Sequence, residues 1–292
     1  KLSVSYNTYY GFQNINQKIP VLGRVGYQTI NSELLTNAGQ PLVPGNNPAS
    51  NLYIDNIDTD WQDAGYKDGY IMNHNLNFTG GSANTSYFVS LDYLDNKGTL
   101  VGNGPDYKRY SFRVNTATEL GKFKFGENLY VMRSDENPLF NTASINLPGG
   151  RPTLVNDLLQ AAPTIPVYDP NRLGGFGGAD AVQHQSITLN VPGLNSLIDN
   201  NTVVNRVLAN LYGELEIIPG LKYKLNLQYD NTDITDQLFV PEYDLGYFFP
   251  GPTAQLRVGT RNSSSYLVEN TLNFERTFND KHSLKVLLGQ TF

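Results

Sequence analysis

The ten residues from Leu221 to Asp230 read Leu-Lys-Tyr-Lys-Leu-Asn-Leu-Gln-Tyr-Asp. Every odd-numbered position is apolar or aromatic, and every even-numbered position is polar. Because successive side chains of a strand point to opposite faces, this pattern predicts a β-strand with one apolar and one polar face. Its length matches the roughly 9 to 11 residues that a tilted strand needs to cross a bilayer, whereas strands of soluble proteins most often have about 5 or 6.

The same alternation recurs in eight further segments, so we expect about nine strands. These segments are residues 2–12, 70–78, 87–93, 110–116, 123–131, 207–217, 266–274 and 284–292. Their apolar residues keep one phase, apart from Glu127, which shares a face with Phe125 and Leu129. A charged side chain is unfavourable on a lipid-facing surface, so we expect a β-bulge beside Gly126 that turns Glu127 inward.

The expected connections alternate in length. Short, turn-rich ones lie at residues 80–84, 119–122, 218–220 and 278–281, and long ones lie at residues 13–69, 134–202 and 231–262, with a shorter one around 96–105. Outer-membrane barrels combine short periplasmic turns with longer extracellular loops. We therefore predict an all-β, transmembrane antiparallel β-barrel wall; the alternative is a soluble protein whose sheet buries one face.

Composition narrows the function classes. No stretch approaches the roughly 20 apolar residues of a membrane-spanning helix, the chain has no Cys, and its three His are far apart in sequence. The formal net charge is -6, with scattered basic residues, which argues against nucleic-acid binding. Neither a catalytic set nor a cofactor motif is recognisable, so we expect no enzyme, no metal centre and no cofactor.

An acidic cluster formed by Asp55, Asp58, Asp60 and Asp63 raises the question of a cation site. It lacks the glycine and the closing glutamate that an EF-hand loop needs in fixed positions. A solvated loop at the entrance to the barrel is the preferred interpretation, and the sequence leaves cation binding open.

Several segments, in order, resemble SusC/RagA-type TonB-dependent transporters, which are outer-membrane nutrient importers of Bacteroidota. The segments are Asp58-Thr59-Asp60-Trp61-Gln62-Asp63, Met72-Asn73-His74-Asn75-Leu76, Gly80-Gly81-Ser82, residues 87–98, residues 107–115, Asn270-Thr271-Leu272-Asn273-Phe274, and residues 282–290. Each segment alone is weakly specific, whereas their shared order and spacing are much more so.

The resemblance implies that residues 1–292 form part of the barrel domain, about nine strands of a 22-stranded barrel with long extracellular loops. The family's signal peptide, plug domain and TonB-contacting segment are not recognisable in this chain. The resemblance further implies import of an oligosaccharide or a peptide across the outer membrane of a Gram-negative bacterium, with a SusD-like surface lipoprotein as partner and energy from the TonB complex through the plug. The alternative is a passive porin or a structural scaffold barrel without energised transport.

Two sets of residues are candidates for contact with a ligand or partner. Polar positions of the alternating strands predict a lumen-facing set: Arg109, Arg113, Arg206, Glu214, Lys222 and Lys224. An aromatic loop segment supplies the second set: Tyr243, Tyr247, Phe248 and Phe249. Exposed aromatic rings can stack on a sugar or dock a partner, but the segment can equally fold back into the barrel mouth, which is the preferred interpretation.

Overall fold

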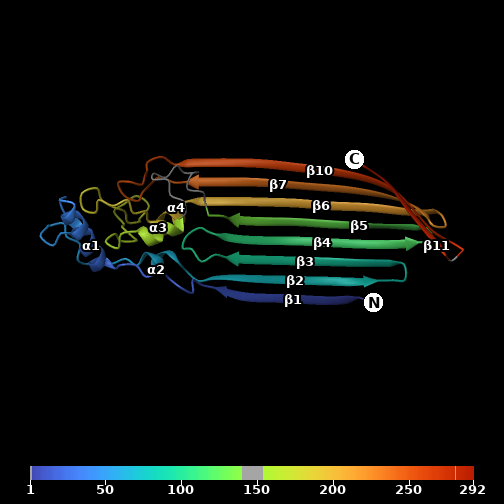
Figure 1. Cartoon of the computed structure of the whole chain (residues 1–292), viewed down its shortest axis with the longest axis horizontal. Helices are drawn as coiled ribbons and strands as arrows, with labels where there is room; N and C mark the ends of the chain where they lie inside the picture. Colours follow the sequence, from blue (N-terminus) through green and yellow to red (C-terminus); the bar gives the residue numbers. More distant parts are fainter. Residues whose placement is uncertain (1, 140–153, 280) are drawn as a thin grey trace.

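The computed structural model describes residues 2–139, 154–279 and 281–292. Within these residues, nine strands form one antiparallel sheet in the order β1-β2-β3-β4-β5-β6-β7-β10-β11, so each strand pairs with its neighbours in the chain (Figure 1). The strands are β1 (Ser3–Gln13), β2 (Gly69–Gly81), β3 (Thr85–Lys97), β4 (Asp106–Leu120), β5 (Phe123–Asn137), β6 (Asp199–Ile218), β7 (Leu221–Val240), β10 (Gln255–Phe278) and β11 (His282–Thr291). The predicted number and antiparallel order of the strands are confirmed.

All the alternating segments place their apolar residues on one face of this sheet, which we call the apolar face. One row of directly paired residues crosses six strands: Tyr6, Leu76, Leu91, Phe112, Val131 and Val207. Aromatic rings pack beside it: Tyr6 and His74 are stacked with ring centroids 6.1 Å apart, and Tyr93 and Tyr110 are tilted with centroids 5.0 Å apart. The opposite face, which we call the polar face, carries Asn, Ser, Asp, Arg and Lys.

The connections lie at opposite ends of the strands (Figure 1). The four predicted short turns fall between consecutive strands, with two or three residues in each connection; residue 280 of the last one lies outside the described residues. The long connections gather at the other end and contain α1 (Arg24–Asn37), the 3-10 helix η1 (Pro44–Asn46), α2 (Trp61–Gly65), α3 (Leu154–Gln160), α4 (Val191–Leu197) and the small strand pair β8 (Tyr243–Asp244) and β9 (Pro250–Gly251).

The expected long loop over residues 231–262 is wrong in extent, because β7 and β10 continue well beyond their apolar segments. Their outer halves form a polar ladder, in which Asn231 Nδ2 donates to Ser264 Oγ at 2.8 Å and Arg261 pairs with Asp236 at 3.0 Å. Apolar side chains such as Phe239, Leu256 and Val258 are too few in this part of the hairpin to give the continuous alternation from which a strand could be predicted.

The expected bulge at Gly126 is also wrong. The register of β5 with β4 and β6 runs through Gly126 and Glu127 without a shift, and the irregularity lies instead between Glu216 and Ile218, beside the β6–β7 turn. Glu127 therefore stays on the apolar face, exposed and four residues from the start of β5 at its short-turn end. If this face meets lipid, the unfavourable free energy is small here because it falls to about 0–1 kcal/mol near the membrane interface.

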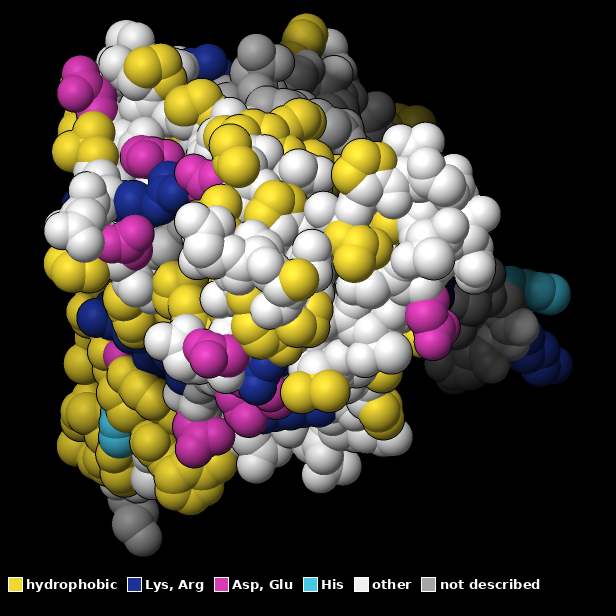
Figure 2. All heavy atoms as spheres, turned by 90° about the vertical axis from the view of Figure 1, so that its left-hand side faces the viewer, with side chains coloured by type: hydrophobic (Ala, Val, Ile, Leu, Met, Phe, Trp, Pro, Cys, Tyr) yellow, Lys and Arg dark blue, Asp and Glu magenta, His cyan; other side chains and the backbone are white. Residues whose placement is uncertain are grey.

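A hydrophobic core lies among the long connections, in a part of the molecule that we call the lobe (residues 14–68, 98–105, 154–198 and 241–254). Trp61, Leu158, Leu194 and Phe249 are among its fully or almost fully buried side chains. The Trp61 indole donates to Ala162 O at 2.9 Å, so the first and the second long connections pack into one unit. Figure 2 views this end and shows hydrophobic and charged side chains mixed over it, with the densest hydrophobic area at the lower left.

Within the described residues, no helix is both long enough and apolar enough to cross a membrane.

Candidate functional site

The six predicted lumen-facing residues all lie on the polar face, on β4, β6 and β7. The strand register brings Glu214 directly opposite Lys224, and Glu216 directly opposite Lys222. Sequence alternation therefore assigned these side chains to a common face correctly. That this face lines a barrel lumen stays a prediction.

Four of the six residues form ion pairs. Arg109 meets Asp92 at 3.0 Å, and Lys222 meets Glu214 at 3.3 Å. Arg206 donates two hydrogen bonds to the two carboxylate oxygens of Asp230, at 3.0 and 2.7 Å. This fork-shaped geometry is the strongest form of the arginine–carboxylate interaction. The charge of these four residues is thus largely balanced within the wall itself.

The other two residues, Arg113 and Lys224, lie over tyrosine rings. The Arg113 guanidinium is 5.2 Å from the centre of the Tyr130 ring, and the Lys224 ammonium is 5.0 Å from that of Tyr212. A cation over an aromatic face is attracted by the ring quadrupole, which holds the side chain in place without cancelling its charge.

Gly126 makes the placement of Tyr212 possible. A Cβ atom on Gly126 would lie 2.3 Å from Thr116 O and 2.7 Å from the Tyr212 hydroxyl oxygen. Any larger residue would therefore push the ring away from the sheet. Gly126 therefore leaves room for Tyr212 on the polar face. It does not redirect Glu127, because the strand register has no shift there.

A row of side-chain amides crosses the polar face and begins at Asn115, two residues after Arg113 on β4. Asn115, Asn128, Asn210 and Gln228 are directly paired across β4, β5, β6 and β7. Asn128 donates to Asn210 at 3.2 Å, and Asn210 donates to Asn226 at 2.7 Å. Together with Arg113, Tyr130 and Arg206, this row lines a hollow of about 410 Å³.

The predicted loop aromatics divide into buried and exposed members. Tyr243 and Phe249 belong to the core of the lobe, and burial raises the pKa of the Tyr243 phenol. Phe248 packs against that core, whereas Tyr247 is 45% exposed. Most of the segment thus packs into the lobe, and Tyr247 offers the most exposed ring of the four. That the segment lies in a barrel mouth stays a prediction.

The acidic cluster serves helix starts and an ion pair. Asp58 accepts from the backbone N–H of Arg24 at the start of α1, at 2.6 Å. Asp60 caps α2 by accepting from the N–H groups of Gln62 and Asp63, both at 2.9 Å, and Asp63 pairs with Lys18. Helix N-termini favour such carboxylates. No group of three potential metal-ligating side chains occurs in the part of the chain that the structure describes.

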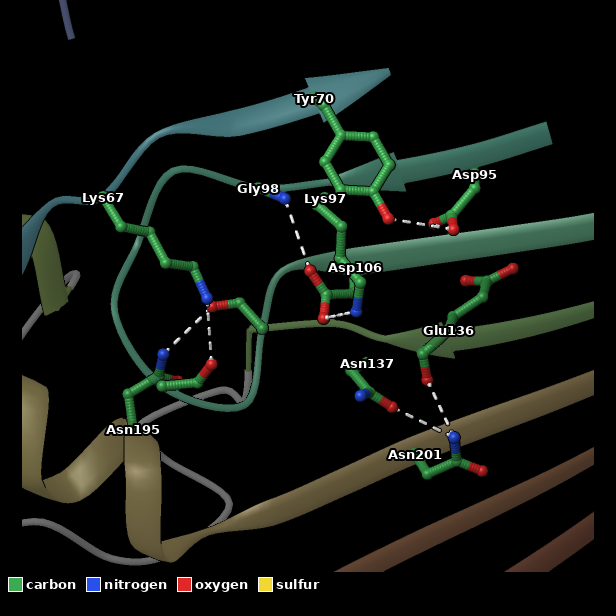
Figure 3. Close-up of polar contacts among 12 residues, drawn as sticks. Lys67, Tyr70, Asp95, Lys97, Gly98, Asp106, Glu136, Asn137, Asn195 and Asn201 are labelled. Atoms are coloured by element: carbon green, nitrogen blue, oxygen red, sulfur yellow. Dashed lines mark hydrogen bonds and ion pairs between the residues drawn. The ribbon is translucent and has the colours of Figure 1, made fainter. Parts of the chain in front are cut away.

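Sequence reasoning missed the junction between sheet and lobe (Figure 3). Asp95 is buried at the end of β3, where its Oδ2 atom accepts from the hydroxyls of Tyr70 and Tyr93, both at 3.1 Å. Asn195 of α4 donates to Val101 O and Gly104 O, at 2.7 and 3.0 Å. Asp95 and Tyr93 share the apolar phase of β3, so their common face follows from the sequence, whereas Tyr70 comes from β2, whose register with β3 the sequence does not give.

Comparison with known sequences relates the whole chain to outer-membrane receptors. It is 26% identical, over its full length, to a TonB-dependent receptor of Formosa agariphila, of which it covers 27%. It is 29% identical, over 59% of its length, to the TonB-dependent receptor SusC of Bacteroides thetaiotaomicron, of which it covers 16%. No known protein-family model matches the sequence.

Comparison with solved structures agrees. The RagAB peptide transporter matches the full chain with a TM-score of 0.76 at 19% identity, and the chain covers 34% of that structure's chain. The RagAB peptide importer in its "closed-closed" state matches 99% of the chain with a TM-score of 0.69 at 21% identity. The fold is therefore that of a fragment of a TonB-dependent barrel. The chain spans between 16% and 34% of the length of these relatives, which are receptors and transporters.

Proposed function

We propose that this chain, a barrel segment of the SusC/RagA type, forms part of the wall of an outer-membrane importer that uses TonB-derived energy to take up an oligosaccharide or a peptide. The observation that carries the proposal is the two-faced, nine-stranded sheet. Its large apolar side chains lie on one face without a protein layer to cover them, as lipid contact requires. The proposal assigns no catalytic step to the chain.

The polar face supports a transport role. Its ion pairs balance most of the charge within the wall, and its amides offer both donors and acceptors of hydrogen bonds. Such a surface can contact sugars and peptide backbones through many weak interactions. Tight binding at every position would instead slow the release of a ligand in transit.

The lobe supports a partner at the loop end. We infer a SusD-like surface lipoprotein there, with the TonB complex acting through a plug that belongs to the rest of the protein. Exposed apolar side chains such as Val25, Ile30 and Leu34 on α1 leave a surface that another protein can cover. The core beneath them gives that surface a fixed shape.

The test uses the full-length protein in its own bacterium. The wild type is compared with a deletion of the whole gene and with a strain that lacks TonB. Maltodextrin oligosaccharides and casein-derived peptides are the probes, and mass spectrometry follows their depletion from the medium. We expect uptake of one probe class to be lost in both mutants, and a surface lipoprotein to co-purify with the tagged transporter.

Uptake that depends on the gene and continues without TonB would overturn energised import in favour of a passive porin. Unchanged uptake in the gene deletion would remove both transport roles. Purification of the transporter without a lipoprotein would refute the partner alone.

A further inference from the structure

The three arginines of the candidate set differ in their charge balance. Arg109 and Arg206 each have an aspartate partner, at 3.0 and 2.7 Å. Arg113 forms no ion pair with any carboxylate among residues 2–139, 154–279 and 281–292, although it lies on the same face. It is therefore the one arginine of the candidate set that has no carboxylate partner among the described residues.

Tyr130 holds the Arg113 guanidinium in place. The residue lies directly opposite Arg113 in the pairing of β4 and β5, and its ring supports the guanidinium at 5.2 Å. The Arg113 side chain remains exposed. Stacking uses the flat surface of a guanidinium and leaves its N–H edges available, so the group can donate two parallel hydrogen bonds to a planar acceptor.

The hollow beside Arg113 supplies further polar contacts. The amides of Asn115, Asn128, Asn210 and Gln228 line it, and Arg206 reaches it with its charge already cancelled by Asp230. The hollow thus presents one net positive charge surrounded by neutral amide groups. Its volume of about 410 Å³ lies within the range of small-ligand sites.

We propose that Arg113 binds a carboxylate carried by the transported ligand, with the amide row contacting the atoms next to that carboxylate. The single charge and the planar edge of the guanidinium match a carboxylate, and amides can complete the hydrogen bonding of its remaining lone pairs. Both the C-terminus of a peptide and the uronic acid of an oligosaccharide offer this group. The inference rests on the proposed function, because it places a ligand in the lumen.

The test measures which member of a matched probe pair binds to the purified full-length protein. One pair is an alanine octapeptide and its C-terminal amide; the other is tetragalacturonic acid and galactotetraose. Each pair is supplied at equal concentrations, and mass spectrometry gives the ratio of bound acid to bound neutral probe. The Arg113→Gln and Arg113→Lys variants are compared with Arg257→Gln, which removes an exposed arginine of β10 that lies outside the hollow.

We expect the wild type to favour the acid in one pair by about tenfold or more, since hydrogen bonds to charged groups are the strong ones. Arg113→Gln should reduce the ratio to near one, Arg113→Lys should keep part of the preference, and Arg257→Gln should keep all of it. The pair that shows the preference identifies the source of the carboxylate.

Two results would overturn the proposal. The first is a wild type without preference for the acid in either pair. The second is a preference that Arg113→Gln leaves unchanged, which would assign the recognition of the carboxylate to another residue. Uptake that continues in the strain without TonB, together with an intact acid preference of the purified protein, would refute energised import and leave the carboxylate site standing.

Discussion

The sheet and the lobe place their apolar side chains in opposite ways. In the sheet they are exposed: Tyr6 is 58% exposed and Leu211 is 55% exposed. The lobe buries them: Trp61 is 2% exposed and Phe249 is 1% exposed. The two regions belong to one chain and are continuous through the strand ends.

This difference indicates that the two regions are stabilised by different surroundings. The sheet is held together by backbone hydrogen bonds between its strands, and its apolar face is suited to contact with an apolar medium. The lobe has the dry interior of a water-soluble protein, so it is expected to stay folded above a membrane surface. Substitutions in one region should therefore act without much effect on the other.

The largest expected effect comes from Trp61→Ala in the core of the lobe. Removal of a buried aromatic side chain typically lowers the free energy of unfolding by about 3–5 kcal/mol, and here the indole hydrogen bond to Ala162 O is lost as well. Hydrogen exchange of residues 154–198 should rise strongly while exchange in the strands stays slow. Tyr247→Ala, at an exposed ring, is the control. Equal loss of protection in the strands would contradict the independence of the two regions.

The next effect should come from Leu91→Arg, at the centre of β3 on the apolar face. If this face meets lipid, a midplane arginine reduces the free energy of unfolding by about 2–4 kcal/mol. Urea titration of the full-length protein in lipid vesicles measures this change. Ser90→Arg places the same charge on the polar face and should cost much less. Equal costs for the two variants would mean that the faces are not in different media.

Gly126→Ala tests how closely the polar face is packed. Its Cβ would lie 2.3 Å from Thr116 O, so we expect a loss of about 1–3 kcal/mol from local rearrangement. Gly213→Ala is a matched control because the nearest atom to its Cβ, Phe123 Cζ, is 3.7 Å away. The same vesicle titration applies, and an unaffected Gly126→Ala protein would show that Tyr212 can move freely.

The smallest effect is a pH dependence confined to the lobe. Burial lowers the pKa of His184 below its ordinary value of 6.5, so the imidazole stays neutral in the folded lobe. As the pH falls below 6.5, the unfolded state takes up a proton that the folded state does not, and stability is lost by at most about 1.4 kcal/mol per pH unit. Hydrogen exchange of residues 180–190, corrected for intrinsic rates, should show this between pH 7.5 and 5.5.

The His184→Gln variant removes this titration and should flatten the dependence. A parallel change in the strands would be unexpected. Asp180 acts in the same direction at lower pH, because hydrogen bonds from the backbone N–H groups of Gln183 and Val182 lower its pKa. That contribution is present above its ordinary pKa of 3.8 and is lost as the pH falls through the lowered value.

The sequence was sufficient for the membrane-type part of the sheet. Alternation with a period of two is a local property, and it placed residues such as Leu91, Arg113 and Leu227 on their faces before any pairing was known. It failed for the outer half of the β7–β10 hairpin, where polar residues predominate on both faces and interrupt the alternation. The bulge predicted at Gly126 was also wrong, because a side chain at this position would collide with Tyr212, a residue of the neighbouring strand β6.

The sequence by itself therefore determined the strands, their two faces and the six polar candidates, because these follow from the order of residues along one strand. Only the tertiary structure decided which charges meet. Asp92 reaches Arg109, Asp230 reaches Arg206, and Arg113 reaches a tyrosine ring instead of a carboxylate. The physical reason is that pairing depends on register between strands, and a register shift of one residue would exchange every partner.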